Sequence, residues 1–154
     1  MECANVLLQK FPAEEFIITS KMKFYPNEKL ENEKAGLAIM GMSYANIALQ
    51  NKKNSVYLIE SVCKDAYNGN AETEFVVTKI SSNEIDLRVK VKQAFKCFFS
   101  YSLDGKNFIN AGNEFNAVPG RWIGAKAGIF CTRESQANDS DYAGFDWFRV
   151  KPLQ

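Results

Sequence analysis

The sequence predicts an all-β fold in which two antiparallel sheets pack face to face as a jelly-roll β-sandwich. Three observations favour this fold. Apolar and polar residues alternate along much of the chain, short apolar segments recur with turn residues between them, and no segment carries the i, i+3, i+4 apolar stripe of an amphipathic helix. Many short strands joined by turns are typical of a sandwich or a barrel.

The alternation is clearest over residues 16–24 and 85–92. In the first segment one face is apolar except for Ser20, and in the second four aliphatic side chains alternate with four charged ones. Such a pattern is expected of an antiparallel strand with one wet face. Residues 35–42 are apolar throughout and contain two glycines, which favours a strand covered on both faces. We expect further strands at residues 44–50, 56–63, 74–80, 95–101, 125–131 and 145–150.

One hairpin turn is predicted together with its residues. Asp104-Gly105 lies between aromatic, alternating arms, and this dipeptide tolerates the positive φ that tight hairpin turns require. The apolar faces of the predicted strands supply the core. The predicted core residues are Phe16, Ile18, Phe24, Leu37, Ile39, Leu87, Val89, Phe99, Ile129, Phe130, Phe145 and Phe148.

Length and composition narrow the possible functions. The 154 residues predict a single domain, residues 1–154, with no linker or internal repeat. A formal charge of +1 gives no overall field to hold nucleic acid or an anionic membrane surface. The absence of His excludes Ser-His-Asp and Cys-His catalysis and His-ligated zinc. Carboxylate chemistry, calcium-type oxygen ligation or no chemistry remains.

The four cysteines, Cys3, Cys63, Cys97 and Cys131, are far apart in the sequence and form no CxxC pair. We therefore expect reduced, buried thiols in place of a disulfide framework or a zinc site. The first sixteen residues lack the basic and apolar segments of a signal peptide, and no segment is long and apolar enough to span a bilayer.

Asp146 is the candidate metal ligand, because it lies between aromatic residues in the last predicted strand. Two interpretations remain open for it. It is either a strand carboxylate that faces solvent or accepts backbone hydrogen bonds, or a ligand of a structural calcium ion. In the second case backbone carbonyls and Glu14 or Glu15, near the start of the domain, would supply further ligands, and Glu15 is the residue we predict.

Exposed aromatic side chains are the other candidates, because sugar rings stack on aromatic faces. Tyr44, Tyr57, Tyr67 and Trp122 are candidates for binding carbohydrate, and packing in the core or in a hairpin is the alternative for each. No pair of carboxylates can be assigned from the sequence as the acid and base of a glycosidase, so an independent active site is not expected.

Several motifs, in their order and spacing, resemble a known family. They are LLQKFPA at 7–13, AGL at 35–37, LRV at 87–89, SYSLDG at 100–105, GRWIGAKAGIF at 120–130 and FDWFR at 145–149. Together they cover residues 7–150. The chain resembles the C-terminal concanavalin A-like β-sandwich domain of glycoside hydrolase family 43, which contains β-xylosidases and α-arabinofuranosidases.

The resemblance implies an accessory domain without catalytic residues of its own. In that family the catalytic carboxylates lie in a separate β-propeller of the same polypeptide, which would be the partner of this domain, and the substrate is plant cell-wall polysaccharide. In some members a loop of the sandwich closes the substrate pocket. Some related sandwiches bind calcium through an acidic residue of the last strand, and Asp146 is the matching position. A secreted or periplasmic location of the larger protein is expected.

Two other functions remain open. The chain would be an independent carbohydrate-binding module for xylan or arabinoxylan if aromatic side chains line a groove. It would be a stand-alone hydrolase or lyase with a site on the concave face if two carboxylates face each other in a pocket.

Overall fold

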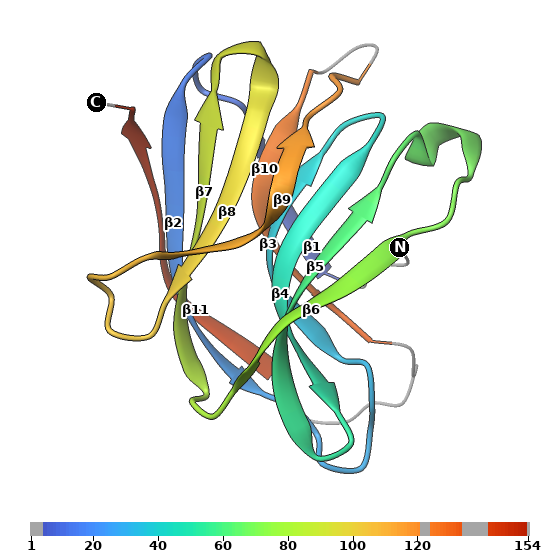
Figure 1. The fold of residues 1–154 in the computed structure, drawn as a ribbon, viewed down its shortest axis with the longest axis vertical. Coiled ribbons are helices and arrows are strands. Elements are labelled where there is room, and N and C mark those ends of the chain that lie inside the picture. Colours follow the sequence, from blue (N-terminus) through green and yellow to red (C-terminus); the bar gives the residue numbers. More distant parts are fainter. Residues whose placement is uncertain (1–4, 121–123, 134–141, 154) are drawn as a thin grey trace.

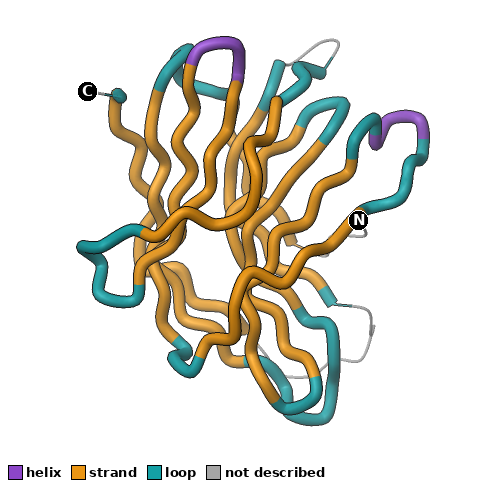
Figure 2. The backbone as a smooth tube through the Cα atoms, in the orientation of Figure 1, coloured by secondary structure: helices purple, strands orange, loops and turns teal. Residues whose placement is uncertain are grey.

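The structure, a computed structural model, describes residues 5–120, 124–133 and 142–153. It consists of two antiparallel sheets packed face to face, as the sequence predicts (Figure 1). The six-stranded sheet has the order β1-β10-β3-β4-β5-β6, and the five-stranded sheet has the order β11-β2-β7-β8-β9. Strands account for most of the backbone, and the short helical turns lie in connections (Figure 2).

The chain crosses several times between the two sheets, and some consecutive strands stay in the same sheet. Those of the six-stranded sheet are β1 (Asn5–Lys10), β3 (Lys34–Met40), β4 (Tyr44–Lys52), β5 (Ser55–Cys63), β6 (Thr73–Ile80) and β10 (Lys126–Thr132). Those of the five-stranded sheet are β2 (Phe16–Tyr25), β7 (Glu84–Lys92), β8 (Lys96–Ser102), β9 (Ile109–Asn116) and β11 (Tyr142–Pro152). The two 3₁₀ turns are η1 (Ala66–Asn68) and η2 (Gln93–Phe95), and no helix in the described part of the chain could cross a membrane.

Two strands, β1 and β9, are not predicted from the sequence. Strand β1 is an edge strand whose side chains are mostly exposed, so its composition carries little apolar signal. Strand β9 is rich in asparagine and contains Gly112, and it buries only Ala111 and Phe115. Both strands form because a neighbouring strand supplies hydrogen-bonding partners, β10 for β1 and β8 for β9.

The main core lies between the sheets and confirms most of the predicted core residues. Ile129, Phe145 and Phe148 are only partly buried and pack against its margin. Phe130 is buried, but it belongs to a second cluster with Ala38, Ala48 and Ile59. Because alternate residues of a strand face opposite sides, this cluster lies on the outer face of the six-stranded sheet. Strand β3 is therefore covered on both faces, as predicted.

Only some of the charged side chains predicted on the outer face of β7 are exposed to solvent. Asp86 is 7% exposed, and this burial raises the pKa of its carboxyl group. The guanidinium of Arg88 lies over the ring of Phe108, with its Cζ atom 3.3 Å from the ring centroid. On β2, the buried hydroxyl of Ser20 donates a hydrogen bond to the carbonyl of Trp147 at 2.8 Å. The one polar residue on the apolar face of β2 is thus satisfied by β11.

The Asp104-Gly105 turn connects β8 and β9, and Gly105 has the positive φ of 71° that the sequence predicts. The connection is longer than a tight two-residue hairpin loop. Asp104 organises it, because its Oδ1 atom accepts hydrogen bonds at 2.8 Å from the backbone N–H groups of Lys106 and Asn107 and from the hydroxyl of Ser102. These hydrogen bonds hold the pKa of Asp104 well below its usual range.

Candidate functional site

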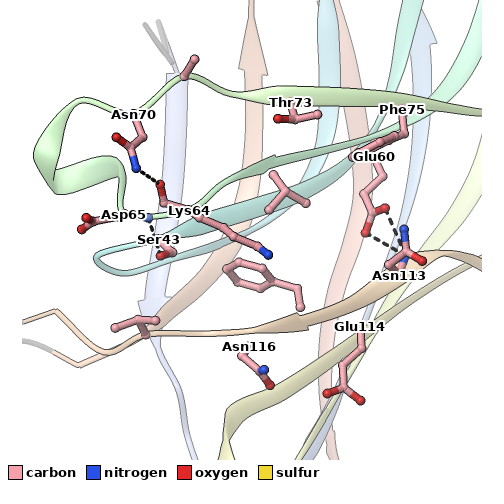
Figure 3. A pocket seen from close by; sticks show the side chains of 14 residues that line it. Ser43, Glu60, Lys64, Asp65, Asn70, Thr73, Phe75, Asn113, Glu114 and Asn116 are labelled. Carbon is pink, nitrogen blue, oxygen red and sulfur yellow. Dashed lines mark hydrogen bonds between the residues drawn. The ribbon is translucent and has the colours of Figure 1, made fainter.

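A cleft with a volume of about 820 Å³ lies where β5 and β6 of one sheet approach β9 of the other (Figure 3). One wall consists of β5, the connection that follows it and β6. The other wall consists of residues 113–116 of β9 together with Val118. Strands β6 and β9 are the edge strands of their sheets, so the cleft opens along one side of the sandwich.

Glu60 is the buried charged group of this cleft. It lies on β5 between Leu58 and Val62, on the face that points into the sandwich, and is only 1% exposed. The backbone N–H of Asn113 donates to both carboxylate oxygens of Glu60, at 3.2 and 3.1 Å. Burial raises the pKa of Glu60, and the hydrogen bond from Asn113 opposes this shift only in part.

The backbone of β9 is shaped to receive this carboxylate. Gly112 has a φ of 75°, and a Cβ atom at this position would overlap the carboxylate of Glu60. A residue with a side chain would therefore be strained in its backbone and would also displace Glu60. The conformation of Gly112 and the position of Glu60 depend on each other.

The mouth of the cleft combines polar groups with an aromatic ring. Phe75 on β6 is 47% exposed and is the direct cross-strand neighbour of Glu60. The side chain of Lys64 extends into the cleft, whereas the carboxylate of Glu114 points away from that of Glu60 (Figure 3). Glu114 pairs instead with Lys96 at 3.0 Å. Hydrogen-bonding groups beside an aromatic ring suit a binding site. Among the described residues that line the cleft, no two carboxylates face each other as acid–base chemistry would need.

Sequence reasoning missed this cleft. The signal was a single carboxylate, Glu60, on the face of a predicted strand where the neighbouring residues are apolar. A lone acidic residue in a strand does not reveal which residues lie opposite it. The partner Asn113 is 53 residues away, in a strand that the sequence does not predict.

The predicted carbohydrate-binding aromatics are not gathered in this cleft. Tyr44 and Tyr57 lie on the outer face of the six-stranded sheet, opposite Cys63 and Gln50 respectively. They are therefore separated by six residues along β4, about 20 Å. Tyr67 is 66% exposed in η1, and Trp122 lies outside the described residues.

The outer face of the six-stranded sheet also carries a charged network. Glu74 forms ion pairs with Lys34 at 2.6 Å and with Lys52 at 2.8 Å. The side-chain amide of Gln50 donates a hydrogen bond to the same carboxylate at 3.3 Å. Burial would raise the pKa of Glu74, but the bonds to the two lysines outweigh it and lower the pKa. Lys34 also pairs with Glu72 at 3.3 Å. These carboxylates are neutralised in pairs, which suits a structural role.

The two predicted metal ligands lie apart along β2. Asp146 is exposed at the bulge where β11 passes Met22 and Lys21, whereas Glu15 precedes β2 and accepts a hydrogen bond from the backbone of Gln93 at 3.3 Å. In the described part of the chain, no three His, Cys, Asp or Glu residues are grouped to hold a metal ion. Calcium takes six or more oxygen ligands, which can include backbone carbonyls and water, and a calcium ion at Asp146 stays a prediction.

The family is decided by a match over nearly the whole chain. Residues 1–151 match the model of the β-xylosidase C-terminal concanavalin A-like domain of glycoside hydrolase family 43. The chain belongs to this family. The motifs quoted from the sequence, from LLQKFPA to FDWFR, lie within the matched residues, and the predicted resemblance is confirmed.

Relatives of this GH43 C-terminal domain are parts of longer proteins. A β-xylosidase of Formosa agariphila is 31% identical over 70 residues, which are 46% of this chain and 11% of that protein. A bifunctional GH43-CE protein of Bacteroides eggerthii has a TM-score of 0.81 at 20% identity, over 97% of this chain and 19% of its own. A xylan β-1,4-xylosidase of Bacillus halodurans C-125 has a TM-score of 0.78 at 16% identity, over 95% of this chain and 29% of its own.

At these identities the solved structures show the shared fold, and the family match shows which domain the chain is. The chain is a C-terminal domain of GH43 glycoside hydrolases, and the catalytic unit of such enzymes is a separate domain. The sequence-based expectation that this chain is an accessory part of an enzyme agrees with both findings.

Proposed function

We propose that this domain is the non-catalytic accessory domain of a β-xylosidase- or arabinofuranosidase-type glycoside hydrolase that degrades plant polysaccharide outside the cell or in the periplasm. In this proposal it packs on the catalytic propeller of the same polypeptide and shapes its substrate pocket. The observation that carries the proposal is the family match over residues 1–151, because it assigns nearly the whole chain to a C-terminal domain of such enzymes.

One end of the sandwich supports docking on another domain. Three connections are joined there by backbone hydrogen bonds, from Met42 to the carbonyl of Val118 at 2.9 Å and from Tyr67 to the carbonyl of Met42 at 3.2 Å. The side chains of Tyr67 and Val118 are nevertheless 66% and 42% exposed. Exposed apolar side chains on connections that are hydrogen-bonded to one another are suited to contact with a neighbouring domain.

The test compares the parent enzyme with a version that lacks this domain. We expect deletion to lower kcat/KM on aryl xylosides or arabinosides and to lower the melting temperature of the catalytic domain. The 154-residue chain alone should release no sugar from either substrate. Two results would contradict the proposal: a catalytic domain that is equally active and stable without this domain, or turnover by the chain alone that is lost when one of its carboxylates is replaced.

A further inference from the structure

We propose that the cleft beside Glu60 binds a short, neutral oligosaccharide of the xylose type. This inference deepens the proposed function, on which the choice of sugar rests, by assigning a ligand site to the accessory domain itself. The cleft volume of about 820 Å³ lies within the usual range for small-molecule sites, roughly 300–1,000 Å³.

The first argument is the unused hydrogen-bonding capacity of Glu60. An ionised carboxylate offers about four acceptor positions. Within the described part of the chain, the backbone N–H of Asn113 is the one hydrogen-bond donor to this carboxylate, and no lysine or arginine forms an ion pair with it. A buried carboxylate that accepts from a single N–H group gains from additional donors, and sugar hydroxyl groups are such donors.

The second argument is the mixture of charges, which disfavours charged ligands. The side chain of Lys64 reaches into the cleft, so a basic ligand would meet a like charge (Figure 3). The carboxylate of Glu60 would in turn repel a polyanion. A neutral ligand that carries both donors and acceptors can bind Lys64, Glu60 and the side chain of Asn113 without either penalty.

The third argument is the placement of Phe75 beside Glu60. The two residues are direct cross-strand neighbours on β5 and β6, and both line the cleft. Phe75 leaves 47% of its surface exposed. A pyranose ring that lies with its C–H face on this aromatic ring would direct its edge hydroxyl groups toward the carboxylate. Val62 and the buried Phe115 give the cleft an apolar floor.

The test is a titration of the 154-residue chain with xylobiose and xylotriose. Calorimetry and the NMR chemical shifts of the backbone amides monitor the binding. We expect shifts centred on Lys64, Phe75 and Asn113. Phe75→Ala should weaken association at least about tenfold, which corresponds to about 1.4 kcal/mol. The matched control is Tyr142→Ala, which removes a ring that is 57% exposed on β11 of the other sheet and should leave binding unchanged.

Glu60→Gln is the second variant, because it keeps the shape of the side chain and removes its charge. It should weaken binding at neutral pH while the amide spectrum stays that of the folded protein. Three results would overturn the inference: no shifts at saturating sugar, shifts confined to the outer face around Tyr44 and Tyr57, or equal binding by the wild type and Phe75→Ala. These results leave the proposed accessory function intact, because that function is tested by deletion from the parent enzyme.

Discussion

Gly112 and Glu60 fit together across the two sheets of the sandwich. A Cβ atom on Gly112 would overlap the carboxylate of Glu60, and the next residue, Asn113, donates its backbone N–H to that carboxylate. A strand that lacks a side chain at one position thus makes room for a buried charge from the opposite sheet.

This contact predicts a large effect for Gly112→Ala. The φ of 75° costs an L-residue about 1–2 kcal/mol, and displacement of Glu60 adds about 1–3 kcal/mol. The control is Gly69→Ala, because Gly69 has a similar φ of 81° with open space around its Cβ position. Denaturant unfolding of both variants separates the two costs. Equal losses of stability would mean that the carboxylate moves aside freely.

Glu60 also predicts a pH-dependent stability. Burial raises its pKa in the folded state above the unfolded value of about 4.3. The stabilising contribution of the protonated form is therefore fully present below about pH 4.3 and is lost as the pH rises through the raised folded value. In Glu60→Gln this side chain cannot ionise, so no stability is lost as the pH rises. The variant should therefore be more stable than the wild type at pH 7.5, and the difference in stability should be smaller at pH 4. A difference that does not change with pH would contradict the prediction.

The turn at Gly105 should tolerate few substitutions. The φ of Gly105 is 71°, and a Cβ atom would lie 3.4 Å from Oδ2 of Asp86. Gly105→Val should lower the free energy of unfolding by about 1 kcal/mol or more, because a β-branched residue is poorly tolerated at positive φ. The measurement is the denaturant or thermal midpoint. An unchanged midpoint would show that the turn adopts another conformation.

Removal of the buried hydroxyl group of Ser61 should not lower the stability of the fold. The Oγ atom of Ser61 and Oδ1 of Asn46, its cross-strand neighbour, are buried and have no hydrogen-bond partner among the residues that the structure describes. Ser61→Ala removes a desolvated polar group, so stability should stay unchanged or rise by up to about 1 kcal/mol. Ser20→Ala is the matched control and should lose about 1 kcal/mol, because that hydroxyl is bonded to Trp147. Destabilisation by Ser61→Ala equal to that of the control would indicate a bound water.

The buried thiol of Cys97 should be protected from alkylation in the folded protein. Burial raises the pKa of Cys97 to about 12, and Cys63 is likewise a buried free thiol. Since the thiolate is the reactive form, iodoacetamide at pH 8 should label Cys97 very slowly in the folded protein and fully after unfolding without reductant. Mass spectrometry of the labelled peptides measures both. Failure to label the unfolded, unreduced protein would reveal a disulfide.

The sandwich could be predicted from the sequence, because burial of one face of a strand leaves an alternation of apolar and polar residues along the chain. The sequence therefore revealed β2, β7 and most of the core, and its motifs indicated the family. The Asp104-Gly105 turn was also visible, since its conformation depends on local residues.

The places where side chains of different strands meet could be seen only in the folded protein. The tertiary structure placed Tyr44 and Tyr57 at opposite ends of one outer face and separated Asp146 from Glu15 along β2. It formed the cleft from Glu60 and a polar strand, β9, that has too few apolar residues to be recognised. Pairing between strands depends on backbone hydrogen bonds, which form whatever the side chain is, except that proline has no N–H to donate. The sequence pattern therefore records burial but not which strands become neighbours.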